Sequence, residues 1–155
     1  MHVLFVCTGN TCRSAIAEAI ARRDAAARGL AGVVVSSAGS SAWDGAPASD
    51  GALLVGIERK FGLSSHRARQ VSREIADQAD LILAMGPHHV ERIEALGAAG
   101  RPWLLTDYAE RSTAGRAIVD PFGGGLDVYR ATTDELERHI AAVLDRIAGG
   151  TTGAR

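Results

Sequence analysis

The sequence has few cysteines, and neither charge is in excess. Only two cysteines, Cys7 and Cys12, occur among 155 residues. That number is too small for a disulfide framework or for a zinc site made of cysteines alone. The formal net charge is −1, so a broad basic surface that would bind nucleic acid is not expected. Any selectivity for anions must therefore come from a local site.

Long hydrophobic runs are also absent. The apolar run at residues 3–7 is too short for the core of a signal peptide, and no segment approaches the ~20 residues that cross a bilayer. We therefore expect a cytoplasmic protein with no targeting segment and no membrane contact. Thiols stay reduced in that compartment, where a cysteine pair five positions apart is typical of catalysis or redox chemistry.

The hydrophobic content, by contrast, is sufficient for a full core. Apolar residues make up 46% of the chain, and the length suits one domain. We place that domain at residues 1–149 and expect a flexible C-terminal tail at residues 150–155.

Short apolar runs alternate with segments of helical periodicity. Strands are predicted at residues 2–7, 33–35, 80–85 and 103–105, and helices at residues 14–28, 48–61, 72–79 and 87–96. A long loop is predicted at residues 107–125, and a last helix follows it. That helix begins either near Leu126 or at a capping box formed by Thr132 and Glu135. The alternation predicts an α/β fold, with a four-stranded parallel sheet flanked by helices on both faces.

The segment from Cys7 to Ser14 joins the first predicted strand to the first predicted helix. Ligands of such sheets bind at the carboxyl ends of the strands. Gly9 permits a tight turn whose N–H groups surround an anion, and the helix behind it adds a positive dipole end. Arg13 can bind two phosphoryl oxygens with its fork of donors. The same positive field favours Cys7 as a nucleophilic thiolate, to which Ser14 can donate a hydrogen bond. A cysteine and an arginine at this spacing could also be a buried strand residue and a surface residue with no shared role. Their position between a strand and a helix favours the phosphate-binding interpretation.

The chain resembles the low-molecular-weight phosphatases in the stretch VCTGNTCRS at residues 6–14. Further similar segments lie at residues 37–39, 66–69, 79–85 and 120–123, so the resemblance covers nearly the whole chain. Ala15 departs from the family, in which proline is usual there. The resemblance implies the same four-stranded fold, a cysteinyl-phosphate intermediate on Cys7, and no cofactor or metal. It also implies a phosphate-binding loop made of Thr8, Gly9, Asn10, Thr11, Cys12, Arg13 and Ser14.

The resemblance also assigns roles outside the loop. Asp120, whose backbone Pro121 restricts, is expected to protonate the leaving group. Phe122 and Trp43 are expected to form walls of the pocket, although Trp43 could equally serve in packing. Cys12 is expected to protect Cys7 through a reversible disulfide.

The residues around the loop distinguish two branches of the family. Thr11 and residues 120–129 are most similar to the branch that removes phosphate from arginine in proteins. Residues 41–44 and 66–69 are more similar to the tyrosine-directed branch. We favour phosphoarginine in proteins as the substrate, with inorganic phosphate as product, and keep phosphotyrosine as the alternative.

Two other functions would use parts of the same pattern. Arsenate reduction would need an external thiol partner, because the chain has no thiol beyond Cys12 to pass a disulfide outward. A non-catalytic phosphate-binding module would need Arg13 but neither Cys7 nor Asp120.

Several polar residues are read as structural. Asn10 is expected to hold the loop by hydrogen bonds, with His66 supporting it from behind. His88 and His89 face different ways on a helix, so we predict no metal site there. We interpret three arginines as a solvated surface that could also attract anions: Arg67, Arg69 and Arg73. The pattern makes no prediction about oligomeric state.

Overall fold

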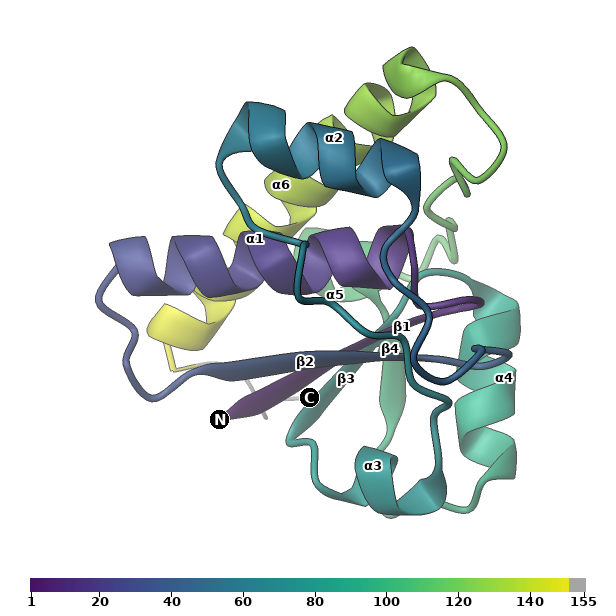
Figure 1. Cartoon of the computed structure of the whole chain (residues 1–155). Helices are drawn as coiled ribbons and strands as arrows, with labels where there is room; N and C mark the ends of the chain where they lie inside the picture. Colours follow the sequence, from purple (N-terminus) through teal and green to yellow (C-terminus); the bar gives the residue numbers. More distant parts are fainter. Residues whose placement is uncertain (151–155) are drawn as a thin grey trace.

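Four parallel strands form the central sheet of the computed structural model, which describes residues 1–150. The strands lie in the order β2-β1-β3-β4 (Figure 1). Their bounds are β1 His2–Cys7, β2 Val34–Gly39, β3 Leu81–Ala84 and β4 Pro102–Leu104. The predicted four-stranded parallel sheet is confirmed.

Helices cover both faces of this sheet, as predicted. Val3 and Phe5 of β1 point into a core shared with four helices, and Leu4 and Val6 point into a smaller core shared with two. The four are α1 Arg13–Ala27, α2 Asp50–Arg59, α5 Leu105–Glu110 and α6 Leu126–Ala148. The two are α3 Arg73–Asp77 and α4 Pro87–Ala95, on the opposite side of the sheet in Figure 1.

Strand β2 is longer than the sequence predicts. The apolar run at residues 33–35 marks only its start, and pairing with β1 continues to Gly39. Residues 36–39 are small or polar and lack an apolar strand pattern. Backbone hydrogen bonds to the central strand β1 hold them in the sheet, so local composition does not reveal them.

Helix α5 was not predicted, because residues 107–125 were read as one loop. The helix has six residues and ends at Glu110, and the next residue, Arg111, has a left-handed φ of 53°. A helix this short shows too little periodicity to be recognised. Tertiary contacts stabilise it, since Leu105 and Tyr108 are buried in the larger core.

The ends of the other helices follow local signals. Ser72 caps α3, as predicted, and its side chain accepts a hydrogen bond from the Ile75 N–H at 3.2 Å. Helix α6 begins at Leu126 and not at Thr132, which is buried within it. The predicted tail at residues 150–155 lies outside the described residues from residue 151 onward.

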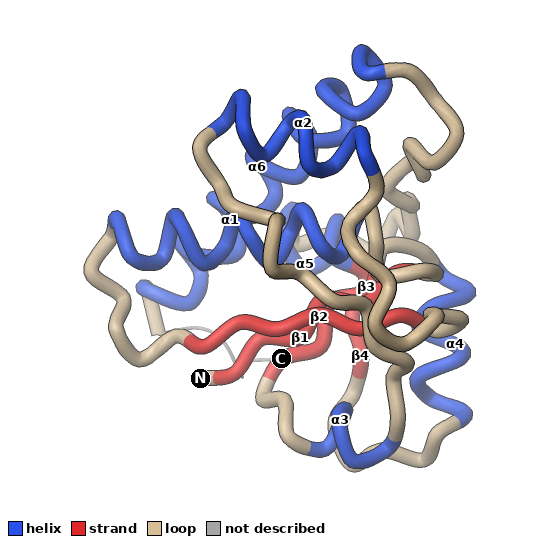
Figure 2. The backbone as a smooth tube through the Cα atoms, viewed as in Figure 1, coloured by secondary structure: helices blue, strands red, loops and turns tan. Residues whose placement is uncertain are grey.

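The carboxyl ends of the strands meet at one edge of the sheet. Cys7, the last residue of β1, is in register with Gly39, the last residue of β2. The Met85 N–H after β3 donates to the Val6 carbonyl at 3.0 Å. The tube in Figure 2 shows the loop from β1 to α1 at this edge, where the central strand meets the first helix.

Candidate active site

A cavity of about 220 Å³ opens at this edge of the sheet. Its lining comes from the loop after β1 and from the segment before α6, namely Cys7, Thr8, Gly9, Thr11, Cys12, Arg13, Asp120 and Phe122. Three side chains to which chemistry was assigned, those of Cys7, Arg13 and Asp120, therefore share one cavity.

The Cys7 sulfur lies among hydrogen-bond donors. Its Sγ is 2.9 Å from Oγ of Ser14 and accepts from the Ser14 N–H at 3.4 Å. The side chain is 2% exposed at the start of α1. Donors from the first turn of a helix stabilise a thiolate, both as a nucleophile and as a leaving group.

Arg13 is a buried cation with an unused donor. Its Nη1 donates to the Ile118 carbonyl at 3.0 Å, and its Nη2 lies 3.5 Å from Oδ2 of Asp120. Its Nε is buried and has no hydrogen-bond partner within residues 1–150. A buried N–H without a partner is costly, so an oxyanion in the cavity would satisfy this group.

Asn10 gives the loop its turn. Its φ of 58° is left-handed, whereas Gly9 has no positive φ, which corrects the expectation that Gly9 supplies the strained turn. Asparagine tolerates this conformation better than most residues, and fixed side-chain hydrogen bonds can hold it there. The Asn10 Nδ2 donates to Oγ of Ser14 at 2.8 Å and to Oγ of Ser37 at 2.9 Å.

A second segment holds Asn10 from the outside. Nε2 of His66 lies 2.6 Å from the Asn10 carbonyl, and Oδ1 of Asn10 accepts from the Arg69 N–H at 3.0 Å. The expected support by His66 is present. Asn10 is completely buried, and together these contacts hold its backbone in the left-handed conformation.

Gly39 allows β2 to approach the loop closely. A Cβ atom at this position would overlap the Thr8 carbonyl oxygen and lie 2.9 Å from Cβ of Ala42. The residues after Gly39 then bind the loop, since Ser40 N–H donates to the Cys7 carbonyl at 2.8 Å and Ser41 N–H to that of Thr8 at 2.9 Å. Sequence reasoning did not predict this role, although residues 37–39 carried part of the family resemblance.

His89 was also missed. Its Nε2 lies 2.8 Å from Oγ1 of Thr8, and the side chain is completely buried. Burial first, and then the charges of His88 and Arg13, lower the pKa of His89 to about 3. The imidazole is therefore neutral near pH 7 and adds no charge beside Arg13. Only its position on α4 next to the loop reveals the contact.

Asp120 lies at the mouth of the cavity. Its side chain is 50% exposed, and Oδ1 accepts from the Phe122 N–H at 3.1 Å, which orients the carboxylate. Thr11 and Phe122 also line the cavity, and the Phe122 ring is largely exposed.

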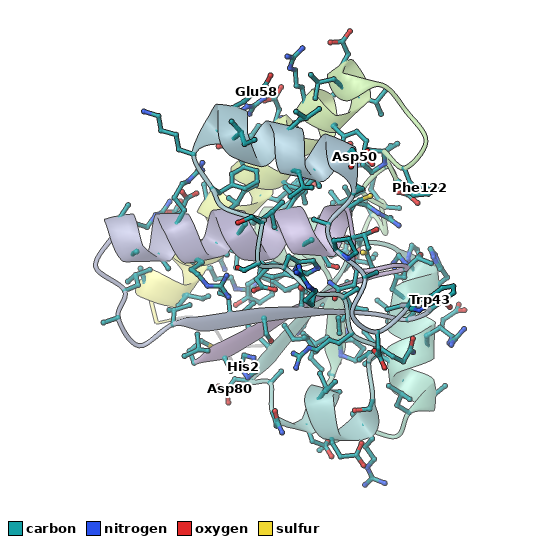
Figure 3. The ribbon with its side chains drawn as sticks, in the orientation of Figure 1. His2, Trp43, Asp50, Glu58, Asp80 and Phe122 are labelled. Carbon is teal, nitrogen blue, oxygen red and sulfur yellow. The ribbon has the colours of Figure 1, made fainter. Side chains whose placement is uncertain are left out.

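Trp43 does not line the cavity. It is 84% exposed, which also argues against a packing role. In Figure 3 the labelled side chains of Trp43 and Phe122 lie apart at the margin of the molecule. The loop after β2 contacts the loop after β1 with its backbone, and the Trp43 side chain stays outside the cavity.

Cys12 is held by two hydroxyl groups. Its Sγ lies 3.2 Å from Oγ of Ser49 and 3.3 Å from the Tyr129 hydroxyl, and those two oxygens are 3.0 Å apart. Burial first, and the hydrogen bond with Cys12 second, raise the pKa of Tyr129 to about 12, so its hydroxyl stays protonated. Both Cys7 and Cys12 are free thiols that line the same cavity.

Two other features are absent from residues 1–150. Within residues 1–150, no three His, Cys, Asp or Glu side chains are grouped so that they could hold a metal ion. In the same range, no helix is long and apolar enough to cross a membrane.

Comparison with known proteins identifies the family. Residues 2–150 match the model of the low molecular weight phosphotyrosine protein phosphatases. A protein-arginine-phosphatase of Geobacillus stearothermophilus is 39% identical over 147 residues, which are 95% of this chain and 93% of the relative. The low molecular weight protein-tyrosine-phosphatase PtpB of Staphylococcus haemolyticus is 38% identical over 137 residues, 88% of this chain and 92% of the relative.

A solved structure agrees in fold. A mutant of the YwlE arginine phosphatase with a phosphorylated active-site serine superposes with a TM-score of 0.90 at 35% identity, covering 96% of each chain. The family model, both relatives and this fold lead to one conclusion: the chain belongs to the low molecular weight phosphotyrosine protein phosphatase family.

Proposed function

We propose that this protein removes phosphate from phosphoarginine in other proteins through a phosphorylated Cys7. The observation that carries the proposal is that Cys7, Arg13 and Asp120 line a single cavity at the carboxyl edge of the sheet. The N–H groups of the loop, with the buried Arg13, would hold the phosphoryl oxygens.

In the first step, the Cys7 thiolate attacks phosphorus and a sulfur–phosphorus bond forms. The bond from phosphorus to the guanidine nitrogen breaks, and the carboxylic acid of Asp120 gives that nitrogen its proton. Arg13 stabilises the charge that the phosphoryl oxygens carry in the transition state.

In the second step, water attacks the phosphorus of the phosphorylated Cys7. The Asp120 carboxylate takes the proton from that water, inorganic phosphate forms, and the Cys7 thiolate leaves. Ser14, whose Oγ is 2.9 Å from the Cys7 sulfur, stabilises the departing thiolate.

The choice of phosphoarginine rests on Thr11 and on the relatives. Thr11 lines the cavity and offers a hydroxyl group, where an aliphatic residue would present an apolar wall to the guanidinium group. The G. stearothermophilus relative is a protein-arginine-phosphatase. The S. haemolyticus relative is a tyrosine phosphatase of similar identity, so phosphotyrosine is the second candidate.

The test is a comparison of kcat/KM for a phosphoarginine peptide and a phosphotyrosine peptide of the same sequence context. We expect phosphoarginine to be preferred, and Cys7→Ser to abolish turnover of both peptides. A preference for phosphotyrosine would replace the proposed substrate, and retained turnover in Cys7→Ser would refute the covalent mechanism.

We also propose that the protein acts in the cytoplasm and that Cys12 protects Cys7 from oxidation. Hydrogen peroxide would oxidise the Cys7 thiolate to a sulfenic acid. The Cys12 thiol would then attack that sulfur, expel water and form a disulfide. The contacts of Cys12 with Ser49 and Tyr129 hold its thiol at the same cavity.

Peroxide should inactivate the wild type, and a thiol reductant should restore its activity. In Cys12→Ser the loss should become irreversible, because the sulfenic acid oxidises further. Mass spectrometry should show loss of two hydrogens in the inactivated wild type. Full recovery of oxidised Cys12→Ser would contradict the protective role.

A further inference from the structure

A second cavity, of about 360 Å³, lies between α1, β2 and residues 62–69. We call it the rear cavity. It shares no lining residue with the active-site cavity, and charged and polar side chains surround it, among them Glu18, Arg22, Ser37, Arg67 and Arg69. Its volume falls in the range of small-molecule sites, which runs from ~300 to ~1,000 Å³.

The rear cavity carries unneutralised positive charge. Nη2 of Arg22 pairs with Glu18 at 2.5 Å, and the other oxygen of Glu18 accepts from Ser37 at 2.5 Å, so this carboxylate is fully engaged. Arg67 and Arg69 form no salt bridge with any carboxylate of residues 1–150. Two guanidinium groups therefore face one cavity without a counter-ion.

The donors of these two arginines can be redirected to an anion. Nη1 of Arg67 donates to the backbone carbonyls of Ser64 and His66, and Arg67 is otherwise exposed. Arg69 uses only Nε, which donates to the Ser37 carbonyl at 2.9 Å, so both of its Nη groups lack partners in the described chain. Planar forks of this kind match the oxygens of a phosphate group.

The walls of the rear cavity also hold the phosphate-binding loop. His66, Arg69 and Ser37 all line the cavity, and all three bind Asn10. Asn10 is the loop residue with the left-handed backbone, so its conformation depends on these contacts. A ligand that moves Arg69 or His66 would therefore change the conformation of the loop through Asn10.

We propose that the rear cavity is a second binding site for a small phosphate-type dianion, held by Arg67 and Arg69 and coupled to the active-site loop through Asn10. The ligand is either inorganic phosphate, which a phosphatase releases, or a phosphate monoester that fills more of the volume. The proposal does not depend on which phosphorylated residue the enzyme prefers.

Binding at the rear cavity can be separated from binding at the loop with Arg13→Ala, which removes the guanidinium from the active site. Inorganic phosphate titrated into this variant should still bind with 1:1 stoichiometry by calorimetry. Its amide NMR signals should shift at residues 62–69. Adenosine monophosphate, titrated in parallel, distinguishes a monoester site from a site for free phosphate by its affinity. Absence of binding by both probes would overturn the proposal.

Arg67→Glu tests the site itself, since this exposed residue binds only backbone carbonyls and its replacement leaves the loop contacts in place. We expect binding in the Arg13→Ala background to weaken at least tenfold. Arg73→Glu is the matched control, because it makes the same charge change at an exposed arginine outside the cavity. Equal weakening by both variants would overturn the site. If Arg13→Ala does not fold, the stoichiometry in otherwise wild-type protein should fall from two to one with Arg67→Glu.

Coupling between the rear cavity and the loop can be measured separately from binding, through the amide NMR signal of Asn10. Occupancy of the rear cavity should shift the Asn10 amide signal in Arg13→Ala, and this shift should disappear in Arg13→Ala/Arg67→Glu. Binding without any shift at Asn10 would overturn the coupling.

Discussion

At the scale of single residues, Arg13 uses only part of its donors within the protein. One Nη donates to the Ile118 carbonyl, the other faces Asp120, and Nε is buried with no partner within the described chain. A buried N–H without an acceptor is costly, and an oxyanion in the cavity would supply the missing acceptor. Asp120 lies 3.5 Å from Arg13 and half-exposed, where it can reach both the leaving group and solvent.

Replacing Asp120 by Asn should slow substrates with poor leaving groups most. General acid catalysis contributes roughly 10²–10⁴-fold, and a good leaving group needs less of it. The measurement is kcat/KM, which reports the step in which the leaving group departs, for a series of aryl phosphates of graded leaving-group pKa. Asp127→Asn is the control, because Asp127 is 96% exposed and lies outside the cavity. Losses that are equal across the series would remove Asp120 from the role of acid.

Thr11 should decide between the two candidate substrates. Thr11→Ile replaces a hydroxyl of the cavity lining with an apolar wall, which penalises a guanidinium group and favours an aromatic ring. We expect the ratio of kcat/KM for phosphoarginine over phosphotyrosine peptides to fall by at least tenfold. Thr11→Val keeps the shape and removes only the hydroxyl, so it separates polarity from bulk. An unchanged ratio in Thr11→Ile would show that another residue selects the substrate.

At the scale of elements, the end of β2 shapes the loop that follows β1. The two strands end in register, and the missing side chain of Gly39 leaves room for the Thr8 carbonyl. Backbone bonds from Ser40 and Ser41 then hold the first two loop residues. The position of Cys7, the proposed nucleophile, therefore depends on a neighbouring strand as well as on its own loop.

Gly39→Ala should displace the loop. The added methyl group would overlap backbone atoms that cannot rotate away, and overpacking of this kind costs about 1–3 kcal/mol of unfolding free energy. We expect kcat/KM and phosphate affinity to fall together with stability, as measured by urea unfolding and phosphate inhibition. Gly32→Ala is the control, since a Cβ atom there meets nothing within 4 Å. Wild-type activity in Gly39→Ala would show that the loop tolerates movement of β2.

At the scale of the whole molecule, α4 on one face of the sheet contacts the loop that leads to α1 on the other. His89 makes this contact through Thr8, and it is buried in the neutral form. Helices on both faces of the sheet therefore contact the loop at its carboxyl edge.

Burial of His89 should make the protein less stable in mild acid. Its folded pKa of about 3 lies below the ordinary value of 6.5. As pH falls below 6.5, the unfolded chain therefore takes up a proton that the folded chain does not, and this favours unfolding. The loss is at most about 1.4 kcal/mol per pH unit between those two values.

The measurement is the free energy of unfolding in urea at pH 7 and pH 5. Wild type should lose more stability over this interval than His89→Gln, in which the group that resists protonation is gone. Leu54→Gln, a change at an exposed residue of another helix, should keep the wild-type pH dependence. An equal loss of stability in wild type and His89→Gln would contradict the linkage.

Some features were determined by the sequence alone, because they depend on residues that are close along the chain. Residues 7–14 join a strand to a helix, and their order places Cys7 and Arg13 at the two ends of one loop without help from distant segments. Alternating apolar runs and helical periodicity predict the parallel sheet with two covered faces. The apolar face of α6 likewise follows from its own spacing.

Other features were decided only by the tertiary structure, because they join residues far apart in the sequence. The approach of Asp120 to Arg13 and of His89 to Thr8 depends on how α4 and the segment before α6 pack at the sheet edge. The left-handed turn at Asn10 exists because β2 and residues 66–69 supply its hydrogen bonds, and no local rule favours it over Gly9. Trp43 stays outside the cavity for the same reason, since packing and not residue type decides which side chains enter it.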